Sequence, residues 1–132
     1  MFLIFDFCYN TIMQATCAII HIDNFSQNFQ VVRERVGQNR KICVPIKADA
    51  YGHGSLRIAQ AAFEAGAYCV AVASVGEAAE LRSGGISGPI MLLSQPLFEE
   101  IPGILEYSLI PLVSDSDFIK IIRLYSILQS TI

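Results

Sequence analysis

The chain has 132 residues, 53% of them hydrophobic and only 16% charged, with a formal net charge of −3. Ordinary soluble domains carry roughly 25% charged residues, so the excess of apolar residues indicates either a membrane protein or a piece of a larger buried assembly. No uninterrupted apolar run approaches the roughly 18 residues that suggest a spanning helix. The scattered Lys and Arg side chains make no electrostatic footprint for nucleic acid. Composition therefore argues against membrane and nucleic-acid partners, and a single domain accommodates this length.

The cysteines are widely spaced, at positions 8, 17, 43 and 69, and no Cys-x-x-Cys pair occurs. Cys43 and Cys69 fall in predicted buried strands, where thiols behave as small hydrophobic groups. This spacing argues against a disulfide framework or a zinc site, and free thiols fit a reducing cytoplasm.

The first predicted elements are a strand and a long helix. The apolar run 17–22 predicts a strand, and Asp23 is a suitable N-cap for the following helix. Apolar residues then recur with helical period, and Gly37 predicts the helix end. That apolar stripe consists of Phe25, Phe29, Val32 and Val36.

Further strands and helices are predicted to alternate along the rest of the chain. Strands are predicted at 41–47, 68–73, 89–93 and 109–113, the first of them containing Pro45, which cannot donate to a strand ladder. Helices are predicted from Ser55 to Gly66, from Ser74 to Gly84, from Pro102 to Leu105, and after a cap at Ser114 or Asp115. Ser74 and Glu77 have the spacing of a capping box.

Strands that alternate with helices every 20 to 26 residues or so predict βαβ units and a parallel sheet. Two α/β architectures fit this pattern: a doubly wound open sheet and an arc of a (β/α)8 barrel. No G-x-G-x-x-G follows the first predicted strand, which weakens the dinucleotide-binding version of the open sheet.

The most informative segment is residues 47–54, which read KADAYGHG. Lys47 follows a predicted buried strand, and its ammonium would have to leave water for an apolar setting that disfavours the charged form. A neutral amine is the nucleophile that forms a Schiff base with an aldehyde. Gly52 and Gly54 allow positive φ and a close approach of the backbone to a ligand. An ordinary structural alternative is a strand-end lysine that reaches solvent, followed by a glycine turn.

This segment closely resembles the pyridoxal-phosphate lysine segment of bacterial alanine racemases. Residues 18–24 (AIIHIDN) look like the first strand and helix start of that family, and residues 65–67 and 72–78 look like its third strand and following helix. The resemblance covers roughly residues 15 to 123 and implies a partial (β/α)8 TIM-type barrel with a parallel sheet, about the first five βα units.

The resemblance also implies a function, namely interconversion of L- and D-alanine with pyridoxal 5'-phosphate as cofactor, supplying D-alanine for peptidoglycan. Lys47 is then the catalytic, cofactor-bearing lysine that acts on one face of the substrate. Tyr51 matches a position whose hydroxyl contacts the cofactor phosphate. In the family a tyrosine from the C-terminal β-domain of a partner subunit serves the other face, and full-length members are homodimers.

The organisation expected from the resemblance has two parts. Residues 1–14 form a leader of doubtful status, with Met13 as the expected natural start. Residues 15–132 form the N-terminal portion of the barrel domain, without the C-terminal β-domain. The chain is accordingly expected to be a fragment, inactive on its own. A racemase of serine or of a broader set of amino acids, and a non-catalytic fragment that retains at most cofactor binding, remain as alternatives.

Other candidate residues favour structural roles. Asp49 and His53 are too few for a metal site without further ligands, so no metal is predicted. His53 is expected to orient the turn through hydrogen bonds. His21, on a predicted buried strand, is expected to be a core histidine, and Leu92 and Leu93 are expected to pack in the core rather than line a substrate pocket.

Overall fold

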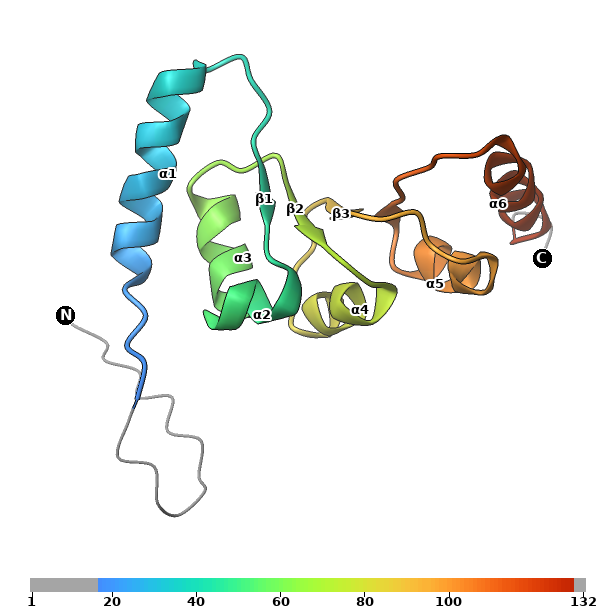
Figure 1. The fold of residues 1–132 in the computed structure, drawn as a ribbon, viewed down its shortest axis with the longest axis horizontal. Coiled ribbons are helices and arrows are strands. Elements are labelled where there is room, and N and C mark those ends of the chain that lie inside the picture. The colour runs from blue at the N-terminus through green and yellow to red at the C-terminus, as the bar shows by residue number, and fades with distance from the viewer. Residues whose placement is uncertain (1–16, 130–132) are drawn as a thin grey trace.

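The computed structural model describes residues 17–129 and shows a four-stranded parallel sheet whose strands alternate with helices (Figure 1). The strands are β1 (Cys43–Pro45), β2 (Cys69–Val72), β3 (Ile90–Leu92) and β4 (Leu109–Ile110). The helices are α1 (Ile22–Val36), α2 (Lys47–Gly52), α3 (Ser55–Glu64), α4 (Val75–Ser83), α5 (Ile101–Glu106) and α6 (Ser116–Gln129), with a short 3-10 helix η1 (Phe98–Glu100) before α5.

The order of the strands favours one of the two predicted architectures. The strands lie side by side in chain order, β1-β2-β3-β4, and each pair is parallel. A doubly wound sheet reverses its strand order at a switch point, and no reversal occurs among the described strands. The described sheet therefore has the strand order of a barrel arc, in agreement with the predicted fold class.

One face of this arc is covered by helices and forms the core. Helix-facing residues at matched positions of the four strands belong to one apolar cluster with residues of α3, α4 and α5. Burying such a row removes apolar surface from water at roughly 25 cal/mol per Å². The row consists of Val44, Val70, Ile90 and Leu109.

The opposite face carries a second row, offset by one residue because side chains alternate along a strand. Its register partners are Pro45, Ala71, Met91 and Ile110. Ala71 is fully buried, whereas Pro45 at one edge and Ile110 at the other are exposed. In a closed barrel this face points to the interior, where side chains stack in layers.

The predicted first strand is absent from the described structure. Residues 17–21 form no strand, and α1 begins at Ile22 without a side-chain cap, so the predicted Asp23 cap is wrong. His21 is exposed rather than buried in a core. The physical reason is that a strand needs a hydrogen-bonded neighbour, and residues 17–21 form no ladder with β1, the edge strand of the described sheet. The sheet therefore has four strands where five were expected.

Helix α1 lies along α3 (Figure 1) and follows its predicted stripe only in its first half. Phe29 is buried and Phe25 packs against the core cluster, whereas Val32 and Val36 remain 47% and 43% exposed. Gly37, with φ of 86°, ends the helix as predicted. The second half of α1 therefore extends past the part of the molecule that its apolar stripe would cover.

The turn and cap predictions hold at most other elements. The Ser74 hydroxyl accepts a hydrogen bond from the Glu77 amide, and the Asp115 carboxylate accepts one from Phe118 N at 2.8 Å. Pro102 lies in the first turn of α5. Within residues 17–129, no helix is both long and apolar enough to cross a bilayer. The predicted leader and Cys8 lie outside the described residues.

Candidate active site

The turn that follows β1 has an unusual backbone. After Lys47, the residues Ala48, Asp49, Ala50 and Tyr51 all adopt the left-handed conformation, with φ between 51° and 57° and ψ between 36° and 52°. This conformation costs an L-residue roughly 1–2 kcal/mol because Cβ approaches the following carbonyl oxygen. Such strain persists only where surrounding contacts enforce it, and it concentrates at functional sites.

Local hydrogen bonds account for part of that enforcement. Ala50 N donates to Ile46 O at 2.9 Å, and the Asp49 carboxylate accepts a bond from Ser55 N at 2.7 Å, at the start of α3. The His53 ring Nδ1 lies 2.8 Å from Ala50 O, which agrees with the predicted orienting role of this histidine. Asp49 and His53 thus bond to backbone groups, and the described residues contain no cluster of three or more potential metal ligands.

A carboxylate from the next βα unit supplies a further contact. Glu77 Oε1 accepts a hydrogen bond from Ala48 N at 2.7 Å, and Glu77 Oε2 accepts one from Ala73 N, also at 2.7 Å. Sequence spacing predicted Ser74 and Glu77 as a capping box, and the Ser74 cap forms at 3.2 Å. The Glu77 side chain, however, reaches the ends of β1 and β2, a role that local spacing does not reveal.

Lys47 lies at the C-terminal end of β1, where barrel enzymes place their catalytic groups. Its side chain is exposed in the described structure. The expectation that the ammonium leaves water is therefore wrong for the described structure. An exposed amine at the carboxyl edge of the sheet is accessible to an aldehyde.

Tyr51 belongs to the same turn, and 58% of its surface is exposed. Together with Ala50 and His53 it lines a groove against the start of α1, next to Asn24 and Phe25. Lys47 does not line this groove. The structure thus places the two predicted site residues on one turn without bringing them into one pocket.

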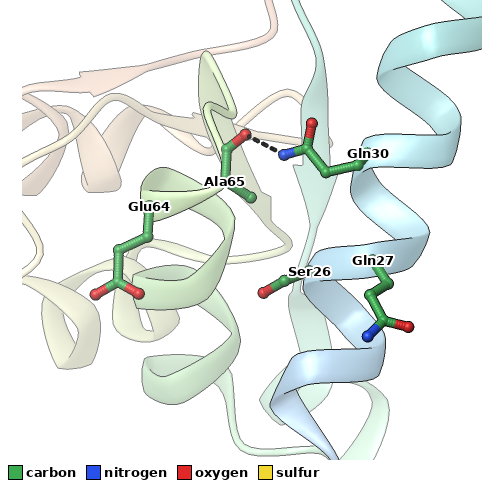
Figure 2. Close-up of a pocket in the computed structure, with 5 residues that line it drawn as sticks. All are labelled: Ser26, Gln27, Gln30, Glu64 and Ala65. Carbon is green, nitrogen blue, oxygen red and sulfur yellow. Dashed lines mark hydrogen bonds between the residues drawn. The ribbon is translucent and has the colours of Figure 1, made fainter.

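A second groove lies between α1 and α3 (Figure 2). Polar side chains line it, and the Gln30 amide donates a hydrogen bond to Ala65 O at 3.2 Å, which ties the two helices together. Figure 2 shows Ser26 and Gln27 on α1 and Glu64 on α3 beside this bond. All residues that line this groove belong to α1, to α3 or to the residue that follows α3, and none follows the carboxyl end of a strand. We therefore assign the groove a structural role.

The cysteine predictions are half right. Cys69 is buried, whereas Cys43, its register partner, is exposed because β1 is the edge strand of the described sheet. Desolvation, and then the hydrogen bond and charge interaction with Cys69, raise the pKa of the Cys43 thiol to about 12. A thiol with so high a pKa is protonated near neutrality and is a poor nucleophile.

Leu92 is buried in the core cluster as expected, while Leu93 is 41% exposed and does not pack there. Space also remains beside the turn. Gly52 and Gly54 have φ of +83° and +87°, and an added Cβ at either position would meet no atom within 4 Å. The exposed amine of Lys47 and the Tyr51 hydroxyl are the groups of this turn that would hold an aldehyde and a phosphate group.

Fold and site together define a segment of a parallel α/β barrel with a lysine at the carboxyl end of a strand. Residues 20–127 match the family model described as "Alanine racemase, N-terminal domain". This match covers most of the chain, and the chain belongs to that family, as the KADAYGHG segment indicated.

Similar proteins agree with this assignment. The chain is 54% identical over 108 residues to an alanine racemase of Treponema denticola, an alignment that covers 82% of the chain and 28% of that protein. A solved alanine racemase from E. faecalis superposes with a TM-score of 0.72 and 31% identity, over 76% of this chain and 27% of that one. A histidine racemase from Leuconostoc mesenteroides superposes with a TM-score of 0.69 and 26% identity, over 76% of this chain and 27% of that one. The chain spans somewhat more than a quarter of the length of these relatives.

Proposed function

We propose that this chain is the cofactor-carrying N-terminal part of an alanine racemase, with pyridoxal 5'-phosphate bound to Lys47. One observation carries the proposal: Lys47 lies exposed at the carboxyl end of β1 and is followed by a strained left-handed turn. The high identity to a named alanine racemase supports it. The setting that follows from the family is the cytoplasm, with D-alanine passing to peptidoglycan.

The proposed chemistry divides between the cofactor and the chain. When bound, the cofactor withdraws electrons from the amino acid and acidifies its Cα–H bond. Lys47 Nζ holds the aldehyde and, once released, removes or returns the proton at Cα on one face. The Tyr51 hydroxyl donates a hydrogen bond to the phosphate. Racemisation also needs an acid or base on the opposite face. We propose that the partner subunit of a homodimer supplies it.

The substrate is the second part of the proposal. We propose alanine, since the relative of highest stated identity is named an alanine racemase. A different amino acid is the second candidate, because a histidine racemase shares the fold of this segment. The pocket that would select between side chains is not defined by Lys47 and Tyr51. Competition among L-alanine, L-serine and L-histidine for the bound cofactor would discriminate between these candidates.

The test of cofactor attachment is borohydride trapping. We expect the chain, incubated with pyridoxal 5'-phosphate and reduced, to carry one phosphopyridoxyl group on Lys47, found by peptide mapping. Lys41 and Lys120, the other two lysines of the chain, serve as internal controls. Lys47→Ala should abolish this labelling. Equal labelling of Lys41 or Lys120 would contradict the proposal.

Turnover is a separate expectation. The chain alone should not convert L-alanine measurably, because Lys47 provides a proton-transfer group for only one face. D-alanine formation can be followed with a D-amino-acid oxidase. Conversion by the 132-residue chain would show that a second acid or base is present within it.

A further inference from the structure

A single half-buried carboxylate joins the C-terminal ends of two neighbouring strands. The two oxygens of Glu77 each accept one backbone hydrogen bond at 2.7 Å, from Ala48 N beyond β1 and from Ala73 N beyond β2. The Glu77 amide in turn donates to the Ser74 hydroxyl at 3.2 Å, which fixes Glu77 in the first turn of α4. Both oxygens are therefore aimed by an element that is itself anchored.

The hydrogen bond between Ala48 N and Glu77 lies directly beside Lys47. The β1–β2 ladder continues to Ile46, whose N–H donates to Ala71 O at 2.7 Å. Ala48 N is bonded instead to Glu77, at the first of the left-handed residues. The carboxylate thus holds the peptide between Lys47 and Ala48, the point at which the chain leaves the strand and enters the strained turn.

We propose that Glu77 is a positioning residue for the cofactor lysine: by holding the Lys47–Ala48 peptide against the end of β2, it directs the Lys47 side chain toward the cofactor aldehyde. The inference rests on the proposed function of Lys47 and goes beyond a helix-capping role for Glu77. An ionised carboxylate suits this task because both of its oxygens are acceptors and bonds to charged acceptors are the stronger ones.

Glu77→Gln is the informative variant. The Gln side chain has nearly the same size, but an NH2 donor replaces one of the two carboxylate oxygens. This donor faces a backbone N–H, so one hydrogen bond is lost. Glu77→Asp keeps the charge and shortens the side chain by one methylene, so it cannot span both amides. Glu80→Gln is the matched control, since Glu80 is an exposed residue of the same helix.

The experiment combines two readouts on the whole chain. Amide hydrogen exchange reports the contacts at Ala48 and Ala73, with Val70 and Val72 as core references. Borohydride trapping with pyridoxal 5'-phosphate reports the yield at Lys47 relative to Lys120. In Glu77→Gln we expect at least tenfold faster exchange at whichever of Ala48 and Ala73 faces the new NH2 group, unchanged exchange at the core references, and at least a tenfold lower Lys47-to-Lys120 ratio. Glu80→Gln should match the wild type.

The outcomes separate the two proposals. If the wild type is not labelled at Lys47, the proposed function fails and this inference fails with it. If the wild type is labelled and Glu77→Gln gives the same ratio, only the positioning role is overturned, whatever the exchange rates. If Glu77→Gln loses protection at Val70 and Val72, the milder Glu77→Asp decides by the same ratio: a selective decrease supports the inference, and a wild-type ratio overturns it.

Discussion

Two neighbouring turns at the same edge of the sheet each lead from a strand into a helix, but their backbone conformations differ. Both follow parallel strands that pair with each other, β1 and β2, and both lead into helices. After β2 the backbone is ordinary: Ser74 has φ of −138° and ψ of 160° and caps α4 with its own hydroxyl. After β1 the chain passes through four consecutive left-handed residues that are not glycine.

The difference shows where the molecule stores strain. The turn after β2 depends on a local cap and on apolar burial of α4. The turn after β1 depends on Glu77, a residue that local sequence assigns to the other turn. The ordinary turn therefore supports the strained one, and the strain lies directly beside Lys47. Four substitutions test this difference between the two turns.

The largest effect is expected in the helix that supports both turns. Leu81 of α4 is 1% exposed and belongs to the core cluster. Leu81→Ala should lower the free energy of unfolding by about 2–5 kcal/mol, because it removes buried apolar contacts and leaves a cavity. Urea unfolding followed by circular dichroism measures this loss. Leu124→Ala, at a residue that is 60% exposed, is the control and should change stability far less.

A smaller effect is expected at Ser74, the N-cap residue of α4 in the turn after β2. Ser74→Ala removes the hydroxyl that accepts a bond from the Glu77 amide, and should cost about 1 kcal/mol of unfolding free energy. The same urea titration applies, with Ser83→Ala at the other end of α4 as the control. An equal loss in both variants would show that the cap is not what stabilises this turn.

Two alanine-to-glycine substitutions test the backbone strain, because they are expected to change the free energy of unfolding in opposite directions. Ala48→Gly should raise the free energy of unfolding by up to about 1 kcal/mol, because glycine adopts positive φ without a Cβ clash. Ala79→Gly, inside the right-handed helix α4, should instead lower it by about 1 kcal/mol. If both substitutions destabilise equally, the left-handed turn is not strained.

The smallest effect concerns a second ordinary turn, at the start of α6. Asp115 accepts hydrogen bonds from Phe118 N and from the Gln95 amide, and these bonds lower the pKa of its carboxyl group. A lowered folded-state pKa contributes stability that is present above the unfolded value of about 3.9 and is lost as the pH falls through the folded value.

Asp115→Asn keeps a capping acceptor but does not titrate. The stability difference between wild type and Asp115→Asn should therefore favour the wild type at pH 7 and shrink below about pH 4. Urea midpoints measured from pH 7 to pH 3 test this, since all other carboxyl groups are common to both proteins. A difference that is independent of pH would contradict the assignment.

Sequence patterns predicted the features that depend on a few adjacent residues. The helix end at Gly37, the Ser74 and Asp115 caps and the strand end before Lys47 all follow from local backbone preferences, and all are present. The predicted strand at 17–22 and the burial of His21 and Cys43 failed, because strand formation and burial depend on which elements lie alongside.

The candidate site divides in the same way. The resemblance of the KADAYGHG segment proposed Lys47 and Tyr51 as site residues, and the glycines predicted the turn at Gly52 and Gly54. The left-handed path of residues 48–51 and the contact from Glu77 to Ala48 were decided only in three dimensions. Non-glycine residues carry no local preference for that conformation, so only contacts between neighbouring βα units can hold the chain in it.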